Sequence, residues 1–149
     1  MNPKTAPAKT VYDGRYLRMQ VRGTWEYAER THAGGLAAII VAVTPDDKVV
    51  FVEQFRVPLQ APAIEMPAGL VGDIHAGESI EESAIRELEE ETGWAADRAE
   101  LLVTGPTSSG MSNERVALVR APGLRTGGPG GGGGRGGSTV PGMPPIGAA

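Results

Sequence analysis

Three glutamates on one predicted helix have the types and spacing that could do chemistry. Seven of the chain's 18 acidic residues fall between Glu78 and Glu91. Glu87 and Glu91 are four residues apart, so on a helix their carboxylates lie one above the other, with Glu90 beside them. Such carboxylates repel one another unless a cation joins them, and hard oxygen ligands of this kind suit Mg²⁺ or Mn²⁺. The pattern therefore predicts a divalent metal site that completes its shell with water and a phosphorylated substrate.

The helix that positions these glutamates has clear start and stop signals. Ser79 followed by Glu82 is a capping box, which predicts that the helix begins near Ile80, and Gly93 is the residue type that ends helices. Apolar residues recur every four positions and predict a buried stripe. The stripe consists of Ile80, Ala84 and Leu88, with Ile85 beside it. An amphipathic helix with a solvated acidic face is the alternative interpretation.

Length and composition restrict the class of protein. The chain has 149 residues and a mass of 15.5 kDa, which predicts one domain over 11–122. We expect 1–10 to be a flexible lead-in and 123–149, rich in Gly and Pro, to be a disordered tail. The net charge of −4 argues against a nucleic-acid binder. The absence of cysteine excludes disulfides, thiolate nucleophiles and cysteine-based zinc sites.

Two further absences bear on location. The N-terminal residues lack the apolar run of a signal peptide, and no stretch approaches the length that spans a membrane. We therefore expect a soluble cytoplasmic protein without membrane partners.

The remaining pattern predicts an α+β domain, with a mixed β-sheet and the acidic helix packed on one side. Strands with turns at Asp13-Gly14 and Arg22-Gly23 are expected over 11–33. The nearly all-apolar 34–43 is typical of a strand covered on both faces. We expect 48–56 to pair back on it as a hairpin partner. The other expected elements are a loop punctuated by Pro58, Pro62 and Pro67, and strands over 101–103 and 116–119.

The acidic segment resembles the Nudix box of the Nudix hydrolases. The matching residues are Gly72, Glu78, Arg86-Glu87-Leu88, Glu90-Glu91 and Gly93-Trp94. The flanking segments resemble the ADP-ribose pyrophosphatase-like branch of this superfamily. They are Trp25-Glu26 with Arg30, Gln54-Phe55-Arg56, Glu65 with Pro67-Ala68-Gly69-Leu70, and Ser109-Gly110 with Ser112-Asn113-Glu114. This resemblance implies a Nudix fold over roughly 11–122.

One departure from the branch affects the assignment of roles. The glycine that opens the box usually belongs to the Pro-Ala-Gly turn, whereas here three residues are inserted and Gly72 satisfies the spacing instead. We therefore place the metal-binding turn at Ala68-Gly69 and treat Gly72 as an incidental match. The insertion is expected to lengthen a surface loop.

The resemblance implies a metal-ligand set. Glu87 and Glu91 would be the principal ligands of Mg²⁺, or of Mn²⁺, with Glu90 assisting and the Ala68 carbonyl adding a backbone oxygen. Arg86 would orient the carboxylates through a bidentate pair with Glu78 or Glu90. The alternative for Arg86 is an ordinary surface ion pair, worth about 0.3–0.5 kcal/mol.

The resemblance also implies a general base and substrate contacts. Glu114 ends a Gly/Ser-rich loop that could act as a lid, and it would be the catalytic base, although an ordinary exposed acid is the alternative. Arg30 and Arg56 are candidate phosphate ligands. Glu65 could bind a ribose hydroxyl or an adenine-side group. Trp25 could stack on the base, or simply pack on the sheet.

The leading hypothesis is Mg²⁺-dependent hydrolysis of ADP-ribose, or a related nucleoside-diphosphate sugar, to AMP and ribose 5-phosphate. The alternatives are another sugar nucleotide, a catalytically silent nucleotide-sensing module, and a poorly folded product. Relatives normally continue with another strand and a C-terminal helix, so the C-terminal part looks truncated or divergent. Natural divergence and a shifted reading frame are the two explanations. The resemblance implies a homodimer in which the N-terminal strands reach across to the other subunit, where the shortened C-terminus permits it.

Overall fold

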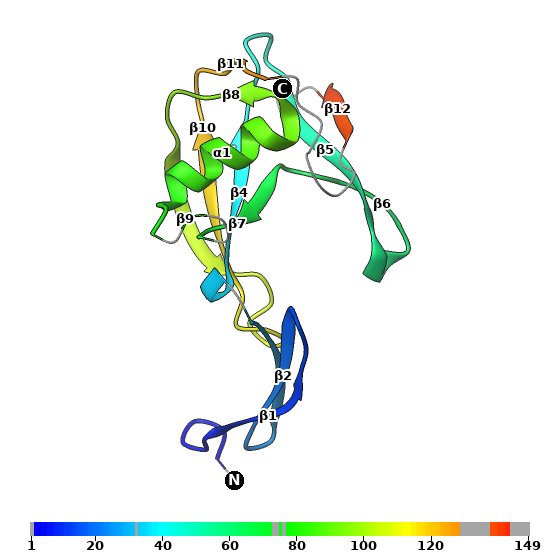
Figure 1. Ribbon diagram of the computed structural model, residues 1–149, viewed down its shortest axis with the longest axis vertical. Coiled ribbons are helices and arrows are strands. Elements are labelled where there is room, and N and C mark those ends of the chain that lie inside the picture. The colour runs from blue at the N-terminus through cyan, green and yellow to red at the C-terminus, as the bar shows by residue number, and fades with distance from the viewer. Residues whose placement is uncertain (1, 32, 73–74, 76, 129–137, 144–149) are drawn as a thin grey trace, which may run out of the picture.

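The structure, a computed structural model, describes residues 2–31, 33–72, 75, 77–128 and 138–143. An N-terminal three-stranded sheet extends away from a larger body (Figure 1). That body contains a four-stranded mixed sheet, one α-helix, a second three-stranded sheet and a two-stranded sheet. The α+β class with a mixed sheet is therefore confirmed.

The N-terminal sheet is an antiparallel meander of three short strands. They are β1 (Ala8–Asp13), β2 (Leu17–Arg22) and β3 (Trp25–Arg30), paired in chain order. The expected turns separate them, and Gly23 adopts a φ of 64°, a left-handed conformation that glycine tolerates without strain. Because β1 begins at Ala8, part of the segment expected to be flexible lies in a strand.

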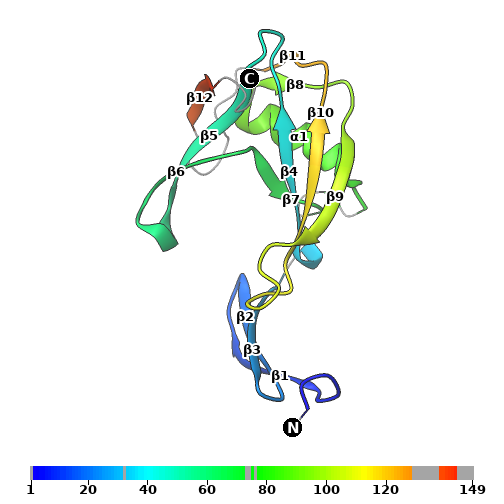
Figure 2. The same cartoon turned by 180° about the vertical axis from the view of Figure 1, so that it is seen from behind.

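The central sheet brings together strands that are far apart in sequence. The short helix η1 (Ala33–Gly35) leads into β4 (Leu36–Ala42), which pairs in parallel with β10 (Arg115–Ala121). The outer strands, β7 (Ala68–Leu70) and β9 (Glu100–Pro106), are antiparallel to their neighbours. The resulting order is β7-β4-β10-β9, visible from behind in Figure 2.

The acidic helix, α1 (Ile80–Thr92), has the predicted limits. The Ser79 hydroxyl accepts a hydrogen bond from the Glu82 amide at 3.1 Å, and the Glu82 carboxylate accepts one from the Ser79 amide at 2.9 Å. Gly93 has a φ of 75° and its amide donates to the Glu89 carbonyl, which closes the last turn. The capping box and glycine stop are both confirmed.

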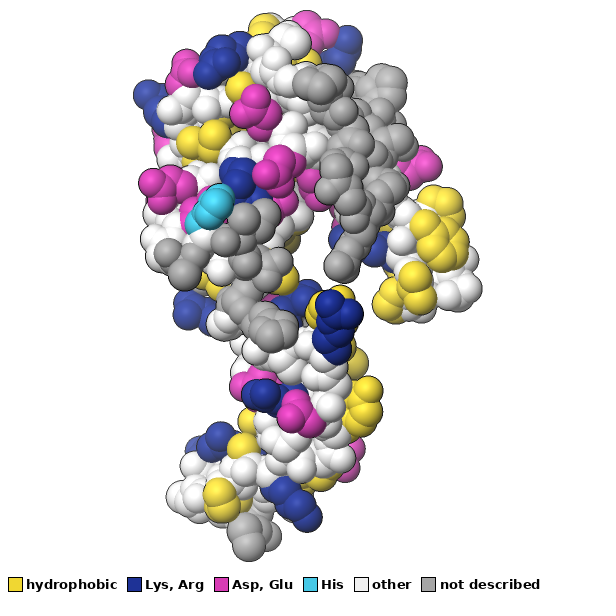
Figure 3. Space-filling view, in the orientation of Figure 1, with side chains coloured by type: hydrophobic (Ala, Val, Ile, Leu, Met, Phe, Trp, Pro, Cys, Tyr) yellow, Lys and Arg dark blue, Asp and Glu magenta, His cyan; other side chains and the backbone are white. Residues whose placement is uncertain are grey.

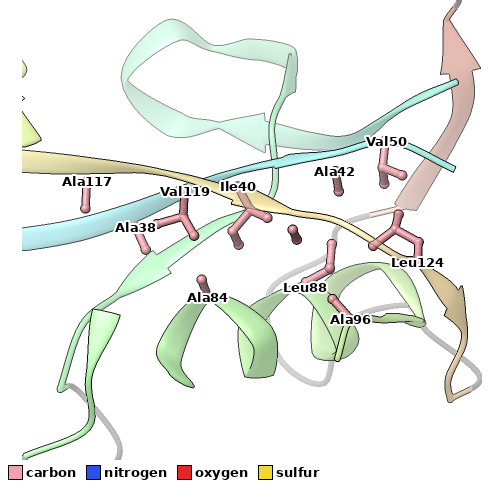
Figure 4. Packing of buried hydrophobic residues seen from close by; sticks show 11 residues of the cluster. Ala38, Ile40, Ala42, Val50, Ala84, Leu88, Ala96, Ala117, Val119 and Leu124 are labelled. Atoms are coloured by element: carbon pink, nitrogen blue, oxygen red, sulfur yellow. The ribbon is translucent and has the colours of Figure 1, made fainter. Parts of the chain in front are cut away.

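The hydrophobic core lies between α1 and the central sheet. Ala84 and Leu88 point from the helix towards Ile40 and Val119, and all four are fully buried (Figure 4). Small residues opposite the helix, including Ala38, let it approach the sheet closely. Truncating a buried leucine such as Leu88 to alanine would cost about 2–5 kcal/mol of stability. This packing fixes which helix face remains for chemistry.

Burial along β4 differs from the expectation of a strand covered on both faces. Ala38, Ile40 and Ala42 are buried, whereas the alternate residues Ala37, Ile39 and Val41 are only half-buried. The helix covers one face alone, so β4 alternates between two environments.

The expected hairpin between 34–43 and 48–56 is wrong. β5 (Val49–Arg56) meets the first strand only at a single bridge between Val43 and Val49. It pairs instead with β6 (Ala61–Glu65) and with β12 (Ser138–Met143). Both edges of β4 are already occupied by β7 and β10, so β5 must find other strands.

The segment expected as a proline-punctuated loop contains structure. A short helix, η2 (Val57–Leu59), is followed by β6 and β7. Pro62 lies within β6 opposite Phe55. β6 lies at the edge of its sheet, the position where a strand tolerates proline because one row of amide groups needs no partner.

Strands also occur within 123–149, the tail expected to be disordered. β11 (Arg125–Thr126) pairs with β8 (Trp94–Ala95), and β12 pairs with β5. The rest of that expectation, over 129–137 and 144–149, lies outside the described residues, as do Asp73, Ile74 and Ala76 of the inserted surface loop. Within the described ranges, no helix has the length and apolar character needed to cross a membrane.

Candidate metal and substrate site

Glu87 and Glu91 contact the backbone of β7. The Ala68 amide donates a hydrogen bond to Glu91 Oε2 at 3.2 Å. Glu87 lies so close to Gly69 that a Cβ at position 69 would be 2.0 Å from Glu87 Cδ and 2.3 Å from its Oε1. A side chain at position 69 would therefore require Glu87 to move, whereas a Cβ at Gly72, which has a φ of 76°, would meet open space. The geometry supports Ala68-Gly69 as the turn that belongs with these carboxylates.

Arg86 organises the acidic side chains around it. Its Nε and Nη2 donate to the two carboxylate oxygens of Glu78 at 3.0 and 3.1 Å, so the bidentate pair forms with Glu78 rather than Glu90. Its Nη1 donates to Glu87 at 2.9 Å and to Glu90 at 3.2 Å. Figure 3 shows acidic side chains gathered around a basic one over this part of the surface. One guanidinium thus holds three carboxylates.

The charged forms of Glu87 and Glu91, the carboxylates next to β7, are unfavourable without a cation. Burial raises the pKa of Glu87 and of Glu91, and the charge of Glu87 adds to the rise at Glu91. In contrast, the Arg86 guanidinium lowers the pKa of Glu78. Within the described ranges, no three acidic or histidine groups already converge on a metal position, and Arg86 bridges Glu87 and Glu90. The carboxylate oxygens of this cluster are ligands that suit a hard divalent cation, and Gly69 lets the backbone of β7 approach them closely.

Two of the predicted substrate residues, Arg56 and Glu65, lie beside this cluster. Arg56 Nε donates to Glu65 Oε1 at 2.8 Å, and Nη2 pairs with the second oxygen. The charges of both side chains act on the Glu91 carboxylate, where Arg56 lowers and Glu65 raises the pKa. The paired strands β5 and β6 therefore bring a phosphate-binding type of side chain to the metal-ligand candidates.

The other predicted residues, Trp25, Arg30 and Glu114, form a second group. Arg30 Nε pairs with the Glu114 carboxylate, and the Trp25 indole donates to the Gly110 carbonyl at 3.1 Å. Trp25 remains half exposed, so part of its side chain is open to solvent. A cavity of about 230 Å³ lies here. It is lined by Leu17, Ala28, Glu29, Arg30, Ser112 and Glu114.

The two groups lie at the same end of the central sheet. Within the described residues, no hydrogen bond or ion pair joins Glu114 to the helix carboxylates. The strand register gives their relative position. Arg115 on β10, which follows Glu114, is opposite Leu36 on β4, and Gly69 on β7 is opposite Ala38 on β4. The backbone of Glu114 is therefore displaced from that of Gly69 by roughly 10 Å along the strands and two strands across.

Sequence reasoning missed the residues that attach the Glu114 loop to β3. Glu29 accepts a hydrogen bond from the Asn113 side chain at 2.9 Å and another from Gln20 at 2.9 Å. The sequence marks Asn113 only as part of a motif, and nothing in it singles out Glu29. No local signal indicates this contact, because the two residues are 84 positions apart.

Comparison with known proteins defines the class. Residues 34–132 match the NUDIX domain family, and the chain belongs to that family, whose members typically depend on divalent metal ions. The chain also aligns with a solved structure described as an ADP compounds hydrolase, with a TM-score of 0.72 and 22% identity over 90% of this chain and 74% of that one. This second likeness bears on the fold alone.

Curated relatives come from distant organisms. The chain is 36% identical to a methanol dehydrogenase activator from Bacillus methanolicus, over 81% of this chain and 66% of that protein. It is 40% identical to an ADP-ribose pyrophosphatase from Bacillus subtilis, over 60% of this chain and 46% of that protein. It is 39% identical to an ADP-sugar pyrophosphatase from Mus musculus, over 64% of this chain and 46% of that protein. The chain thus spans about half to two thirds of these relatives' lengths.

Proposed function

We propose that this protein is an Mg²⁺-dependent hydrolase that splits the pyrophosphate bond of a nucleoside-diphosphate sugar, with ADP-ribose giving AMP and ribose 5-phosphate as the preferred reaction. The observation that carries the proposal is the packing of Glu87 and Glu91 against Ala68 and Gly69. It holds two partly buried carboxylates, ligands of the kind that bind Mg²⁺, against the Ala68-Gly69 backbone. The relatives named for ADP-ribose and ADP-sugars support the substrate class.

The ion would be held by Glu87 and Glu91, with Glu90 and the Ala68 carbonyl completing the protein ligands. When bound, Mg²⁺ lowers the pKa of a coordinated water and offsets phosphate charge. Arg86 orients the carboxylates and limits their mutual repulsion through its contacts with Glu78, Glu87 and Glu90. Mn²⁺ would fit the same oxygen ligands.

Substrate residues come from both groups. Arg56 would bind a phosphate, positioned by Glu65, which could also accept a hydrogen bond from a ribose hydroxyl. Glu114 would accept the proton of the attacking water, and Arg30 would hold its carboxylate or exchange it for a substrate phosphate. Trp25, which is half exposed, would stack on the base.

A second candidate function has support of its own. The relative named as a methanol dehydrogenase activator favours a chain that acts on, or in concert with, a dehydrogenase. Another sugar nucleotide, or nucleotide sensing without turnover, are the remaining alternatives. NAD, a dinucleotide that carries hydride in dehydrogenase reactions, belongs in the substrate panel for this reason, since it contains the same pyrophosphate bond.

The test is product release from a panel of nucleoside-diphosphate sugars and a dinucleotide, with Mg²⁺ and with chelator. Glu91→Gln should lower turnover about 100-fold or more, because it removes a carboxylate ligand of the ion that would activate the water and offset the phosphate charge. Glu89→Gln is the matched control, since Glu89 is an exposed acid on the same helix. Equal turnover by wild type and Glu91→Gln would reject the enzyme proposal, whereas binding without turnover would favour the sensing module.

A further inference from the structure

The loop 107–114, which carries Glu114, is attached to β3 by backbone hydrogen bonds. The Ala28 amide donates to the Met111 carbonyl at 2.8 Å, and the Asn113 amide donates to the Ala28 carbonyl at 3.3 Å. Ala28 and Ser112 form a parallel bridge. The indole of Trp25 adds a further bond to Gly110. The N-terminal sheet therefore determines where this Gly/Ser-rich loop lies.

A chain of side-chain hydrogen bonds crosses the N-terminal sheet to reach the same loop. The Thr10 hydroxyl on β1 donates to Gln20 Oε1 at 3.1 Å, and Gln20 Nε2 on β2 donates to Glu29 Oε2 at 2.9 Å. The other oxygen of Glu29 accepts from Asn113 Nδ2 at 2.9 Å. Gln20 is buried, with 6% of its surface exposed, so its amide needs these partners. Each of these three hydrogen bonds thus joins a donor to an acceptor.

Two successive residues of β3 thus hold two successive residues of the loop. Glu29 binds Asn113, and Arg30 binds Glu114. Because successive side chains of a strand point to opposite faces, the end of the loop is held from both sides of β3. A loop rich in Gly and Ser would otherwise sample many conformations and present its carboxylate in many places.

We propose that Glu29 and Asn113 are positioning residues for the general base: their contact, here called the Glu29–Asn113 clamp, fixes the loop so that Glu114 presents its carboxylate at one place. This inference rests on the proposed function of Glu114. Among the described residues, the clamp has no hydrogen bond or ion pair with the proposed metal ligands, and it acts through the loop. Its hydrogen bond is solvent exposed, so it contributes little to global stability while it governs the placement of the next residue.

The experiment exchanges the amide of Asn113 and the carboxylate of Glu29. Asn113→Asp places a carboxylate against that of Glu29, and neither group can donate, so the clamp opens. Adding Glu29→Gln restores it, because the introduced amide can donate to the introduced carboxylate while its oxygen accepts from Gln20. Glu29→Gln alone is the matched control. The introduced amide and the Asn113 amide can both rotate, so that each hydrogen bond still joins one donor to one acceptor.

Two measurements report the outcome on the full chain with Mg²⁺ and ADP-ribose. Hydrogen exchange of 107–114 should be about tenfold faster in Asn113→Asp, and kcat should fall about tenfold with KM changed less than about twofold. Both should return to near wild-type values in the double variant. Recovery of slow exchange without recovery of kcat, or a wild-type kcat in Asn113→Asp, would overturn the positioning role.

Different results would contradict the clamp and the proposed function. Wild-type exchange in Asn113→Asp would reject the clamp and leave hydrolysis intact. Absence of turnover in the wild type would reject the proposed function, and with it the role of Glu114 on which the clamp acts.

Discussion

The Glu87 carboxyl group lies so close to Gly69 that a Cβ on residue 69 would be 2.0 Å from Glu87 Cδ. Gly69→Ala must therefore displace either β7 or Glu87. We expect activity to fall about 100-fold, as a displacement of about 1 Å in a catalytic group can cause. Steady-state kinetics with Mg²⁺ measure this effect.

Gly105→Ala is the control for that substitution. Gly105 lies in β9, and a Cβ there would meet nothing within 4 Å. Full activity in Gly69→Ala would show that the position of Glu87 is not important for the reaction.

Mg²⁺ should stabilise the protein through the partly buried Glu87 and Glu91. Burial raises the pKa of both carboxyl groups, so their charged forms destabilise the metal-free fold above those pKa values. At neutral pH and Mg²⁺ about 100 times its Kd, we expect the melting temperature to rise by roughly 5–10 °C, and chelator to reverse the rise.

Glu91→Gln should abolish this Mg²⁺-dependent shift. In chelator it should melt at or above the wild-type temperature, because it removes an unfavourable buried charge while its amide oxygen can still accept from Ala68. Glu89→Gln should retain the shift. A shift of wild-type size in Glu91→Gln would contradict its role as a ligand.

The pair between Glu78 and Arg86 should make stability depend on acidic pH. The guanidinium lowers the pKa of Glu78, so the folded state binds fewer protons than the unfolded state in this range. The resulting stabilisation is complete above the unfolded pKa of roughly 4.3 and is lost as pH falls through the lower folded pKa. Glu78→Gln should cost about 2 kcal/mol at pH 7.

Urea unfolding of both proteins, at pH 7 and at stepwise lower pH, tests this. The difference in unfolding free energy between wild type and Glu78→Gln should shrink as the solution is acidified below about pH 4. A difference that stays constant with pH would show that the ion pair does not contribute through its charge.

The N-terminal sheet should form part of a homodimer. It exposes large apolar side chains, among them Tyr12 at 62%, Val11 at 56% and Leu17 at 48%, which a three-stranded sheet cannot bury alone. We expect sedimentation to give twice the chain mass of 15.5 kDa. Leu17→Lys should shift the equilibrium towards the monomer. A wild-type monomer throughout the assay concentration range would contradict the prediction.

Local features were determined by the sequence itself. The limits of α1 follow from Ser79, Glu82 and Gly93, because capping and helix termination involve residues within a few positions of one another. The face that packs on the sheet, with Ala84 and Leu88, follows from the same helical period. The remaining face could then be identified as the one that carries Glu87 and Glu91.

The tertiary structure alone decided which distant segments meet. It paired β5 with β6 and β12 because β4 already had neighbours on both edges. It also placed Arg30 and Trp25 with the Glu114 loop, while Arg56 and Glu65 joined the helix carboxylates. Strand pairing depends on competition among edges across the whole chain, and no local spacing encodes the result. The close contact between Gly69 and Glu87 likewise arises only once β7 and α1 pack together.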